Sequence, residues 1–292
     1  MKIAGFTIIR NAVINDYPIT EAIRSILPVV DEMIVSVDPG EDDTVSLIQS
    51  IESDKIRIVY STWDMNLRKG GQVLAIETDK AFAQISPDAD WAFYIQADEI
   101  VHEKYHSVIL EAARRYKDDK RVEGLLFNYT HFYGTYDYVG DSRRWYSHEI
   151  RMIRNDKNIK AYRDAQGFKK NGEKLWVKPI EAWIYHYGWV KSPVVMKQKQ
   201  KNIGRFWHSD EEWEDQLKSA DFFDFGNEFD SLQKFTGTHP AVMQERIHKQ
   251  NWKVELDTGI KRFSLKERLL YFFEKKTGVR LFDYKNYRIL RS

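Results

Sequence analysis

An acidic pair follows a short apolar run in the first third of the chain. In WAFYIQADEIVHE, residues 91–103, five apolar residues from Trp91 to Ile95 are soon followed by Asp98 and Glu99. Such a run, bounded by polar residues, is typical of a buried strand. Two adjacent carboxylates at its end offer hard oxygen ligands, which suit Mg²⁺ or Mn²⁺ better than zinc. A strand that simply ends in water would look the same, so the pair by itself leaves both interpretations open.

The elements around this pair alternate between strand and helix patterns. Strands are predicted at residues 3–9, 33–37, 56–60 and 91–95, and helices at 19–27, 44–51 and 74–85. Repeated strand–helix–strand units predict an α/β fold with a mostly parallel sheet flanked by helices. In such sheets, ligands bind beyond the carboxyl ends of the strands. Three polar loops, at residues 38–44, 66–72 and 96–99, are expected at that edge and favour a binding role for the acidic pair.

Composition narrows the class of protein. The chain has 292 residues and a formal net charge of +1, which gives no bulk electrostatic case for nucleic acid as a partner. It has no cysteine, which excludes disulfides, thiol nucleophiles and cysteine-bound zinc, and is in keeping with a reducing compartment. No apolar run reaches the roughly 20 residues of a transmembrane helix, and Met1 is not followed by a secretory signal pattern. We therefore expect a cytoplasmic protein without a transmembrane segment.

The pattern changes beyond about residue 123. Residues 124–139, 143–155 and 183–190 are aromatic-rich and strand-like, whereas the chain from about 197 is charged and helical. The sequence predicts an α/β domain of residues 1–195 and a mainly helical C-terminal extension of residues 196–292. Within the extension, the amphipathic segment 265–276, LKERLLYFFEKK, could make a peripheral contact with a membrane surface. Its short length and mixed charge favour packing against the core instead.

Three segments resemble, in order and spacing, family-two glycosyltransferases with the GT-A fold, in the nucleotide-diphospho-sugar transferase superfamily. They are residues 7–48, 68–82 and 91–101; the first contains VDPGEDDT, the second RKGGQ and the third QADEIV. The resemblance covers residues 1 to about 110, and YHYGW and FTGTHP resemble the family more loosely. It implies a Rossmann-like GT-A fold, with residues 1–110 as the nucleotide-sugar half and 111–195 as the acceptor half. The implied activity is metal-dependent sugar transfer, which we expect to be inverting.

The resemblance also implies roles for individual residues on the donor side. The residues implied to bind the nucleotide sugar are Asn11, Asp38, Asp43, Arg68, Gly71 and Gln96. Asp38 would contact the base or ribose, and Arg68 with Gly71 would lie by the base and pyrophosphate. Gln96 stands where the motif usually has Asp, so it can hydrogen-bond a ribose hydroxyl but carries no negative charge.

The implied metal ligands are Asp98 and His186, holding Mn²⁺ or Mg²⁺. The ion would neutralise charge on the departing diphosphate while the sugar passes through an oxocarbenium-like state. His186 lies among aromatic residues, where a hydrogen-bonded structural histidine is an equal alternative.

Two carboxylates are the predicted catalytic residues. Glu99 would orient the acceptor or a metal-bound water, and Asp164 would take the acceptor's proton as general base. Glu149 and Asp137 are alternatives for the base.

The implied partners are a UDP- or GDP-sugar donor and a saccharide or other hydroxyl acceptor. A non-catalytic nucleotide or glycan binder is an alternative, favoured by Gln96. A nucleotidyltransferase is disfavoured, because Arg10, Asn11 and Ala12 follow the first strand in place of a glycine-rich phosphate loop.

Overall fold

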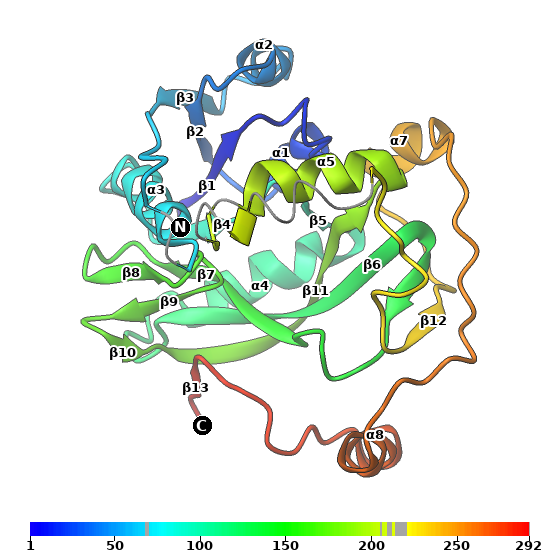
Figure 1. The fold of residues 1–292 in the computed structure, drawn as a ribbon. Coiled ribbons are helices and arrows are strands. Elements are labelled where there is room, and N and C mark those ends of the chain that lie inside the picture. Colours follow the sequence, from blue (N-terminus) through cyan, green and yellow to red (C-terminus); the bar gives the residue numbers. More distant parts are fainter. Residues whose placement is uncertain (68–69, 205, 209–211, 214–220, 292) are drawn as a thin grey trace.

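The first four strands lie side by side and run parallel. The computed structural model describes residues 1–67, 70–204, 206–208, 212–213 and 221–291 (Figure 1). These strands are β1 (Ile3–Arg10), β2 (Glu32–Asp38), β3 (Ile56–Tyr60) and β4 (Trp91–Tyr94), in the order β3-β2-β1-β4. The helices between them are α1 (Ile19–Ile26), α2 (Thr44–Gln49) and α3 (Gln72–Ala83). The strand–helix alternation predicted for this part is confirmed.

The sheet continues beyond β4 with strands from the rest of the chain. The full order is β13-β11-β6-β7-β4-β1-β2-β3, with β5 pairing with β11 and β12 with β6. The added strands are β5 (Glu99–Val101), β6 (Gly124–Gly140), β7 (His148–Arg154), β11 (Trp176–Val190), β12 (Leu232–Lys234) and β13 (Arg288–Ile289). β7 runs antiparallel to both β4 and β6, whereas β6 and β11 are parallel. The predicted fold class, a mostly parallel α/β sheet flanked by helices, is confirmed.

A small separate sheet and several helices complete the described part of the chain. The small sheet consists of β8 (Ile159–Tyr162), β9 (Gly167–Lys170) and β10 (Glu173–Lys174). The other helices are α4 (His106–Tyr116), α5 (Pro193–Gly204), α7 (Gln244–His248) and α8 (Leu265–Thr277), with 3-10 turns η1 (Glu103–Tyr105) and η2 (Ala241–Met243). α5 runs through the predicted boundary at residue 195, and β12 and β13 join the main sheet. The division into two domains stays a prediction.

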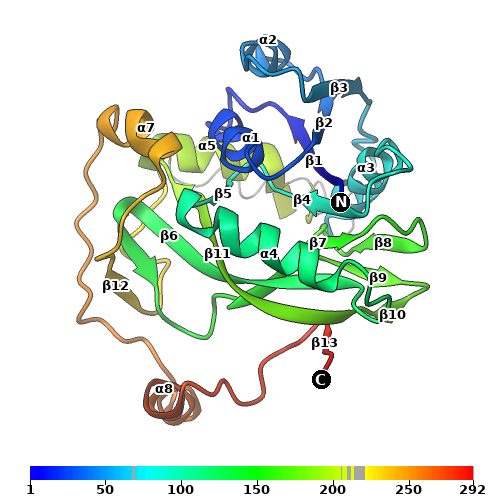
Figure 2. The ribbon, with the colours of Figure 1, turned by 180° about the vertical axis from the view of Figure 1, so that it is seen from behind.

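Apolar cores cover both faces of the sheet. Along β1, Ile3 and Ile9 belong to the core beneath α1 and α4, whereas Phe6 and Ile8 belong to the core beneath α3. Figure 2 shows α1 and α4 on the face opposite α5. A parallel sheet buried on both faces leaves the carboxyl ends of its strands as the natural place for a site.

The helix at residues 265–276 does not behave as expected. Packing of this helix against the core was predicted, but none of the residues of α8 is buried. Polar contacts hold it to the body: the Tyr271 hydroxyl donates to Asp141 at 2.7 Å, and Arg143 donates to Glu274 at 2.7 Å. The expectation of core packing is therefore wrong. None of the helices in the described ranges is both long and apolar enough to cross a membrane.

Candidate functional site

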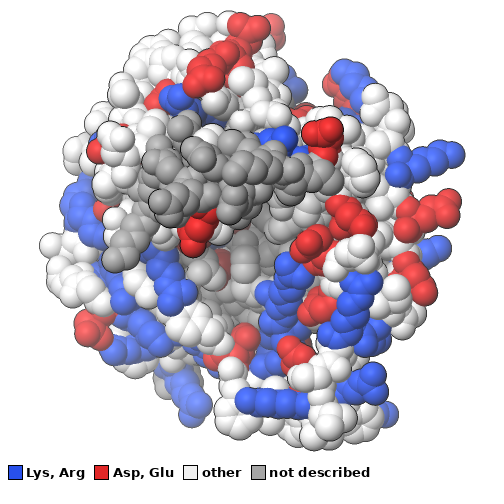
Figure 3. All heavy atoms as spheres, in the orientation of Figure 1, with Lys and Arg blue, Asp and Glu red and all other residues white. Residues whose placement is uncertain are grey.

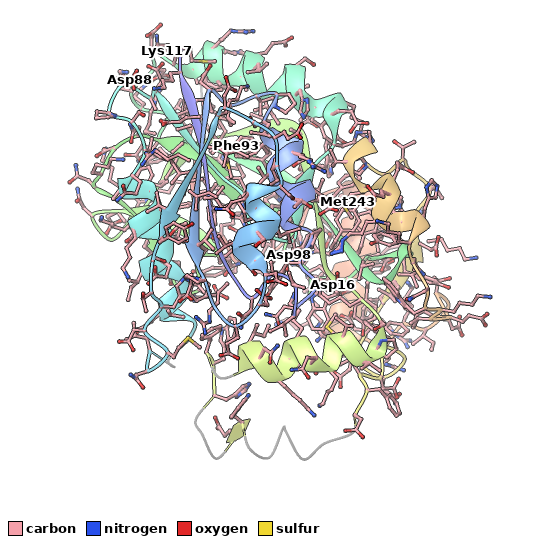
Figure 4. The ribbon with its side chains drawn as sticks, turned by 90° about the horizontal axis from the view of Figure 1, so that it is seen from above. Asp16, Asp88, Phe93, Asp98, Lys117 and Met243 are labelled. Atoms are coloured by element: carbon pink, nitrogen blue, oxygen red, sulfur yellow. The ribbon has the colours of Figure 1, made fainter. Side chains whose placement is uncertain are left out.

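A cavity of about 360 Å³ lies at the carboxyl ends of β1 and β4, next to α5. Figure 4 shows Asp98 at the end of the sheet nearest α5, with Asp88 and Lys117 at the opposite end. The cavity is lined by residues from β1, from the turn after β4, from the β8–β9 hairpin, from β11 and from α5. It thus collects side chains from segments far apart in the sequence.

The structure brings five of the predicted site residues to this cavity. Those that line it are Asn11, Gln96, Asp98, Asp164 and His186. Those that lie outside its lining are Asp38, Asp43, Gly71 and Glu99. Arg68 lies outside the described residues.

Asp98 forms the charged floor of the cavity. Its Oδ2 accepts a hydrogen bond from Lys199 Nζ at 3.2 Å, and its Oδ1 lies 3.7 Å from His186 Nε2. Burial alone would raise the pKa of Asp98, but the nearby positive charge, above all that of Lys199, outweighs burial and lowers that pKa to about 2. Gly188 is required beside it, because a Cβ there would lie 2.7 Å from Asp98 Oδ2. Asp98 is therefore a carboxylate with one oxygen committed to Lys199.

The hydrogen-bond network fixes the tautomer of His186. His131 Nε2 lies 2.8 Å from the Tyr146 carbonyl oxygen and must donate to it. Burial lowers the pKa of His131 well below its ordinary value, so its neutral ring accepts at Nδ1 from His186 Nδ1, 3.2 Å away. Burial also lowers the pKa of His186. Its Nε2 therefore presents a lone pair towards Asp98 Oδ1.

This pair of acceptors suits a cation. Asp98 Oδ1 and His186 Nε2 face each other in a buried setting, where two lone pairs without a proton or cation between them are unfavourable. Within the described ranges, no group of three His, Asp or Glu residues gathers around a point that could hold a metal ion. Mg²⁺ is commonly held by one or two protein ligands together with substrate phosphates. The residues thus fit a divalent ion that binds together with a phosphorylated ligand.

Lys199 brings an ammonium group to the same place. It projects from α5, donates to Asp98 and to the Gly188 carbonyl at 3.0 Å, and lies 4.6 Å from the centre of the Tyr17 ring. Burial would lower its pKa, but Tyr17 and Asp98 outweigh burial and raise it, so the amine stays charged.

Lys199 is not among the residues predicted from sequence; it stands in the run KQKQK among other lysines. Its spacing held a signal: Met196, Lys199 and Ile203 are three and four residues apart. Such residues share one face of a helix.

Glu99 is buried behind the cavity and paired. Arg151 Nε and Nη2 donate to its two carboxylate oxygens at 2.8 and 2.7 Å, and the Tyr129 hydroxyl donates at 2.8 Å. Arg151 Nη1 also donates to the Gln166 carbonyl at 2.8 Å. The pair therefore ties the turn that carries Asp98 to the hairpin that carries Asp164. This placement indicates a positioning role for Glu99 and gives it no contact with the cavity.

Asp164 lies in the loop between β8 and β9, in a constrained backbone. Its neighbours Arg163 and Ala165 have φ of 58° and 61°, a conformation that non-glycine residues rarely adopt. The loop packs on Gly71, where an added Cβ would lie 2.6 Å from Asp164 Cβ. Gly71 has φ of 69° and precedes α3. Gly71, predicted to lie beside the donor, thus packs against Asp164, the predicted base.

Asp38 ends β2, and Asp43 precedes α2. Asp38 is buried, forms an ion pair with Arg10, and accepts from the backbone N–H of Trp63 at 2.8 Å. Asp43 is exposed at the start of α2. The neighbouring Asp42 accepts instead from the Ile14 N–H at 2.8 Å, linking two loops. The structure gives neither Asp38 nor Asp43 a place in the cavity wall, and their nucleotide contacts stay predictions.

Aromatic rings also line the cavity. The aromatic residues lining the cavity are Tyr17, Trp63, Tyr94, Phe206, Trp207 and Trp213. Trp63 and Phe206 have ring centres 6.0 Å apart, and the Trp63 indole N–H is buried without a partner in the part of the chain that is described. Flat apolar surfaces and a charged floor suit a ligand with a planar ring and an anionic group.

No protein-family model and no curated protein sequence matches the chain. Solved structures similar to it include S. aureus TarS 1–349 in complex with UDP-GlcNAc, 14% identical, with 74% of this chain and 69% of TarS covered and a TM-score of 0.40. Glucosyl-3-phosphoglycerate synthase from Mycobacterium tuberculosis, in complex with Mn²⁺, UDP and glucosyl-3-phosphoglycerate, is 21% identical, with 46% and 45% covered and a TM-score of 0.30. 4-Diphosphocytidyl-2C-methyl-D-erythritol synthase from Anaerococcus prevotii is 12% identical, with 53% and 70% covered and a TM-score of 0.32. Overlaps this partial say nothing about the chemistry of this chain, which has to follow from its own residues.

Proposed function

We propose that the chain is a glycosyltransferase that takes a sugar from a nucleoside-diphosphate sugar, with a UDP- or GDP-sugar as donor. The observation that supports this most directly is the cluster of Asp98, His186 and Lys199 at the floor of an aromatic-walled cavity. The cavity lies at the carboxyl ends of parallel strands, where α/β folds bind nucleotides. The same cluster argues less well for a binder of uncharged glycans, which has no use for a buried ammonium.

The donor would bind with its base on the aromatic wall and its diphosphate on the floor. Asn11 and Gln96 line the cavity and would offer side-chain hydrogen bonds to the donor. As the bond between the sugar and the diphosphate breaks, the electron pair goes to the diphosphate oxygen. The Lys199 ammonium stabilises this growing charge electrostatically. A divalent ion held by Asp98 and His186 would act there as a Lewis acid, for which Mn²⁺ and Mg²⁺ are both candidates.

Asp164 would activate the acceptor. Its carboxylate takes the proton from the acceptor hydroxyl as the new bond to the sugar forms, and the nucleoside diphosphate leaves from the other side of the sugar. That geometry inverts the sugar's configuration. Among the alternatives, Glu149 is buried against Gln166 and Asn286, and Asp137 is exposed on β6 outside the cavity wall. The acceptor is a saccharide or another hydroxyl compound.

Two measurements test this function. The melting temperature is measured with UDP, GDP, dTDP and CMP, each with and without Mn²⁺, since a ligand that binds the native state stabilises it by mass action. Release of nucleoside diphosphate from the matching sugar donor is then compared for the wild type and for Asp164→Asn. We expect one diphosphate to raise the melting temperature and Asp164→Asn to lower turnover about 100-fold. Donor affinity should change less than about threefold.

Asp137→Asn, an exposed carboxylate outside the cavity, is the matched control and should keep its turnover. No stabilisation by any of the four nucleotides would contradict the donor site. Full turnover by Asp164→Asn would remove Asp164 as the base. Binding of a diphosphate without any donor turnover by the wild type would favour the non-catalytic binder.

A further inference from the structure

The exposed face of α8 is apolar. Leu265, Leu269 and Phe272 follow one another at spacings of four and three residues, which places them on one face of the helix. Their exposed fractions are 84%, 72% and 63%, and Phe273 beside them is 39% exposed. After the helix ends, Phe282 is 89% exposed. These large apolar side chains are in contact with solvent, and soluble proteins rarely leave such a group uncovered.

The helix itself is well formed and is turned with its polar side inwards. Ser264 and Glu267 make a reciprocal capping box at its start, and Gly278 ends it with φ of 69°. Tyr271 and Glu274 face the body, where they contact Asp141 and Arg143. A surface helix normally shows the opposite arrangement, with its apolar stripe towards the core. The orientation is therefore fixed by specific polar contacts that keep the apolar face outside.

Positive charge gathers in the same segment. Residues 261–291 contain ten Lys or Arg and three Asp or Glu, a net charge of +7 in a chain whose whole net charge is +1. All three acids are engaged within the protein, Glu267 in the helix cap, Glu274 with Arg143 and Asp283 with Arg280. Lys266 and Arg268 are exposed next to the apolar face, as is Lys276 near its end. Figure 3 shows Lys and Arg side chains among uncharged ones at the lower edge of the molecule, where Figure 1 places α8.

We propose that α8 and the loop to Phe282 dock on the surface of an anionic lipid bilayer. The helix lies in the plane of the surface, with Leu265, Leu269 and Phe272 among the acyl chains. The flanking Lys and Arg residues lie at the level of the anionic headgroups. An apolar face bordered by basic residues is the pattern of interfacial helices, and a net charge of +7 is complementary to such a surface. A second copy of the chain would meet the same positive charge on its own α8, which disfavours this face as a dimer interface. The inference does not rest on the proposed function.

The test is flotation of the full chain with vesicles, at low and high salt. One set of vesicles is phosphatidylcholine alone, and the other contains one quarter phosphatidylglycerol. We expect at least tenfold tighter binding to the anionic vesicles, weakened by salt because the basic residues are exposed. Leu269→Ser with Phe272→Ser should reduce this binding at least tenfold, and Lys266→Gln with Lys276→Gln should reduce the preference for anionic lipid. Phe222→Ser, which removes a ring that is 59% exposed elsewhere, is the control and should bind as the wild type does.

The apolar residues replaced are solvent-exposed, so the variants should fold, and their melting temperatures check this. The proposal is overturned if the wild type does not float with anionic vesicles. Equal binding by the Leu269→Ser, Phe272→Ser variant also overturns it. The oligomeric state is measured by sedimentation at the same protein concentrations. A dimer formed by the wild type and not by this variant would also overturn the proposal.

Discussion

At the scale of single residues, the buried Glu99–Arg151 pair holds the two carboxylate-bearing loops of the site together. Both side chains are almost completely buried, and the guanidinium makes two parallel hydrogen bonds with the carboxylate. Removing one partner of such a pair leaves an uncompensated charge in the interior, which costs far more than the pair itself contributes. The position of Asp98 relative to Asp164 therefore depends on a pair that does not line the cavity.

We predict that Arg151→Met destabilises the protein by about 3–5 kcal/mol, because it leaves the buried Glu99 carboxylate without its positively charged partner. Adding Glu99→Leu to this variant should restore more than half of the loss. Urea unfolding of the wild type, the two single variants and the double variant measures this cycle. A double variant no more stable than Arg151→Met alone would show that the charge of Glu99 is not what makes the single change costly.

At the scale of elements, the β8–β9 hairpin presents Asp164 and rests on a second buried acid. Glu149, on β7, accepts hydrogen bonds from Gln166 in the hairpin loop and from Asn286 near the C-terminal strand, each at 2.8 Å. Burial raises the pKa of Glu149 to about 7, against an ordinary value of 4.5. The folded state therefore keeps this proton to a higher pH than the unfolded state does. The stability that neutral Glu149 contributes is present below about pH 4.5 and is lost as the pH rises to about 7.

We predict that Glu149→Gln removes the loss of stability that ionisation of Glu149 causes as the pH rises. Between pH 5 and pH 8, the wild type should lose about 2–3 kcal/mol more of its free energy of unfolding than the variant does. Urea unfolding at four pH values gives the difference, with Glu181→Gln on the exposed side of β11 as the control. Curves for the wild type and Glu149→Gln that run parallel across this range would place the pKa of Glu149 near its ordinary value.

The elements themselves were largely predictable, whereas the contacts between distant ones were not. The short apolar runs of β1 to β4 and the helices between them follow from periodicity, because a parallel sheet buried on both faces needs such runs. The pairing register of the aromatic strands β6 and β11 could not be predicted, because apolar and polar residues alternate too weakly along them. For α8, amphipathicity gave the presence of a helix but not the direction of its apolar face, which depends on Asp141 and Arg143, more than 120 residues away.

At the scale of the whole molecule, the sheet brings together residues that the sequence keeps far apart. Asp98 and Lys199 are 101 residues apart, yet their side chains meet because α5 lies next to the carboxyl end of β4. The predicted Asp98 and His186 reach the same cavity, since β11 pairs with β5 directly after Asp98. The sequence places Lys199 on one helix face with Met196 and Ile203, but its role at the site depends on how α5 packs against the sheet. We propose that this assembled floor binds the diphosphate of a nucleotide.

The most direct test of that claim is calorimetric titration of UDP and GDP into the wild type and Lys199→Met, in Mn²⁺ and in EDTA. Lys199→Arg keeps the positive charge, and Lys201→Met removes a lysine of the same helix that does not line the cavity. We predict that Lys199→Met weakens binding of the preferred diphosphate at least tenfold, about 1.4 kcal/mol, under both conditions. Lys199→Arg should recover part of this loss, and the affinity for the corresponding nucleoside, which has no phosphate, should not change. Equal diphosphate affinity in the wild type and Lys199→Met, with both proteins folded, would contradict the account.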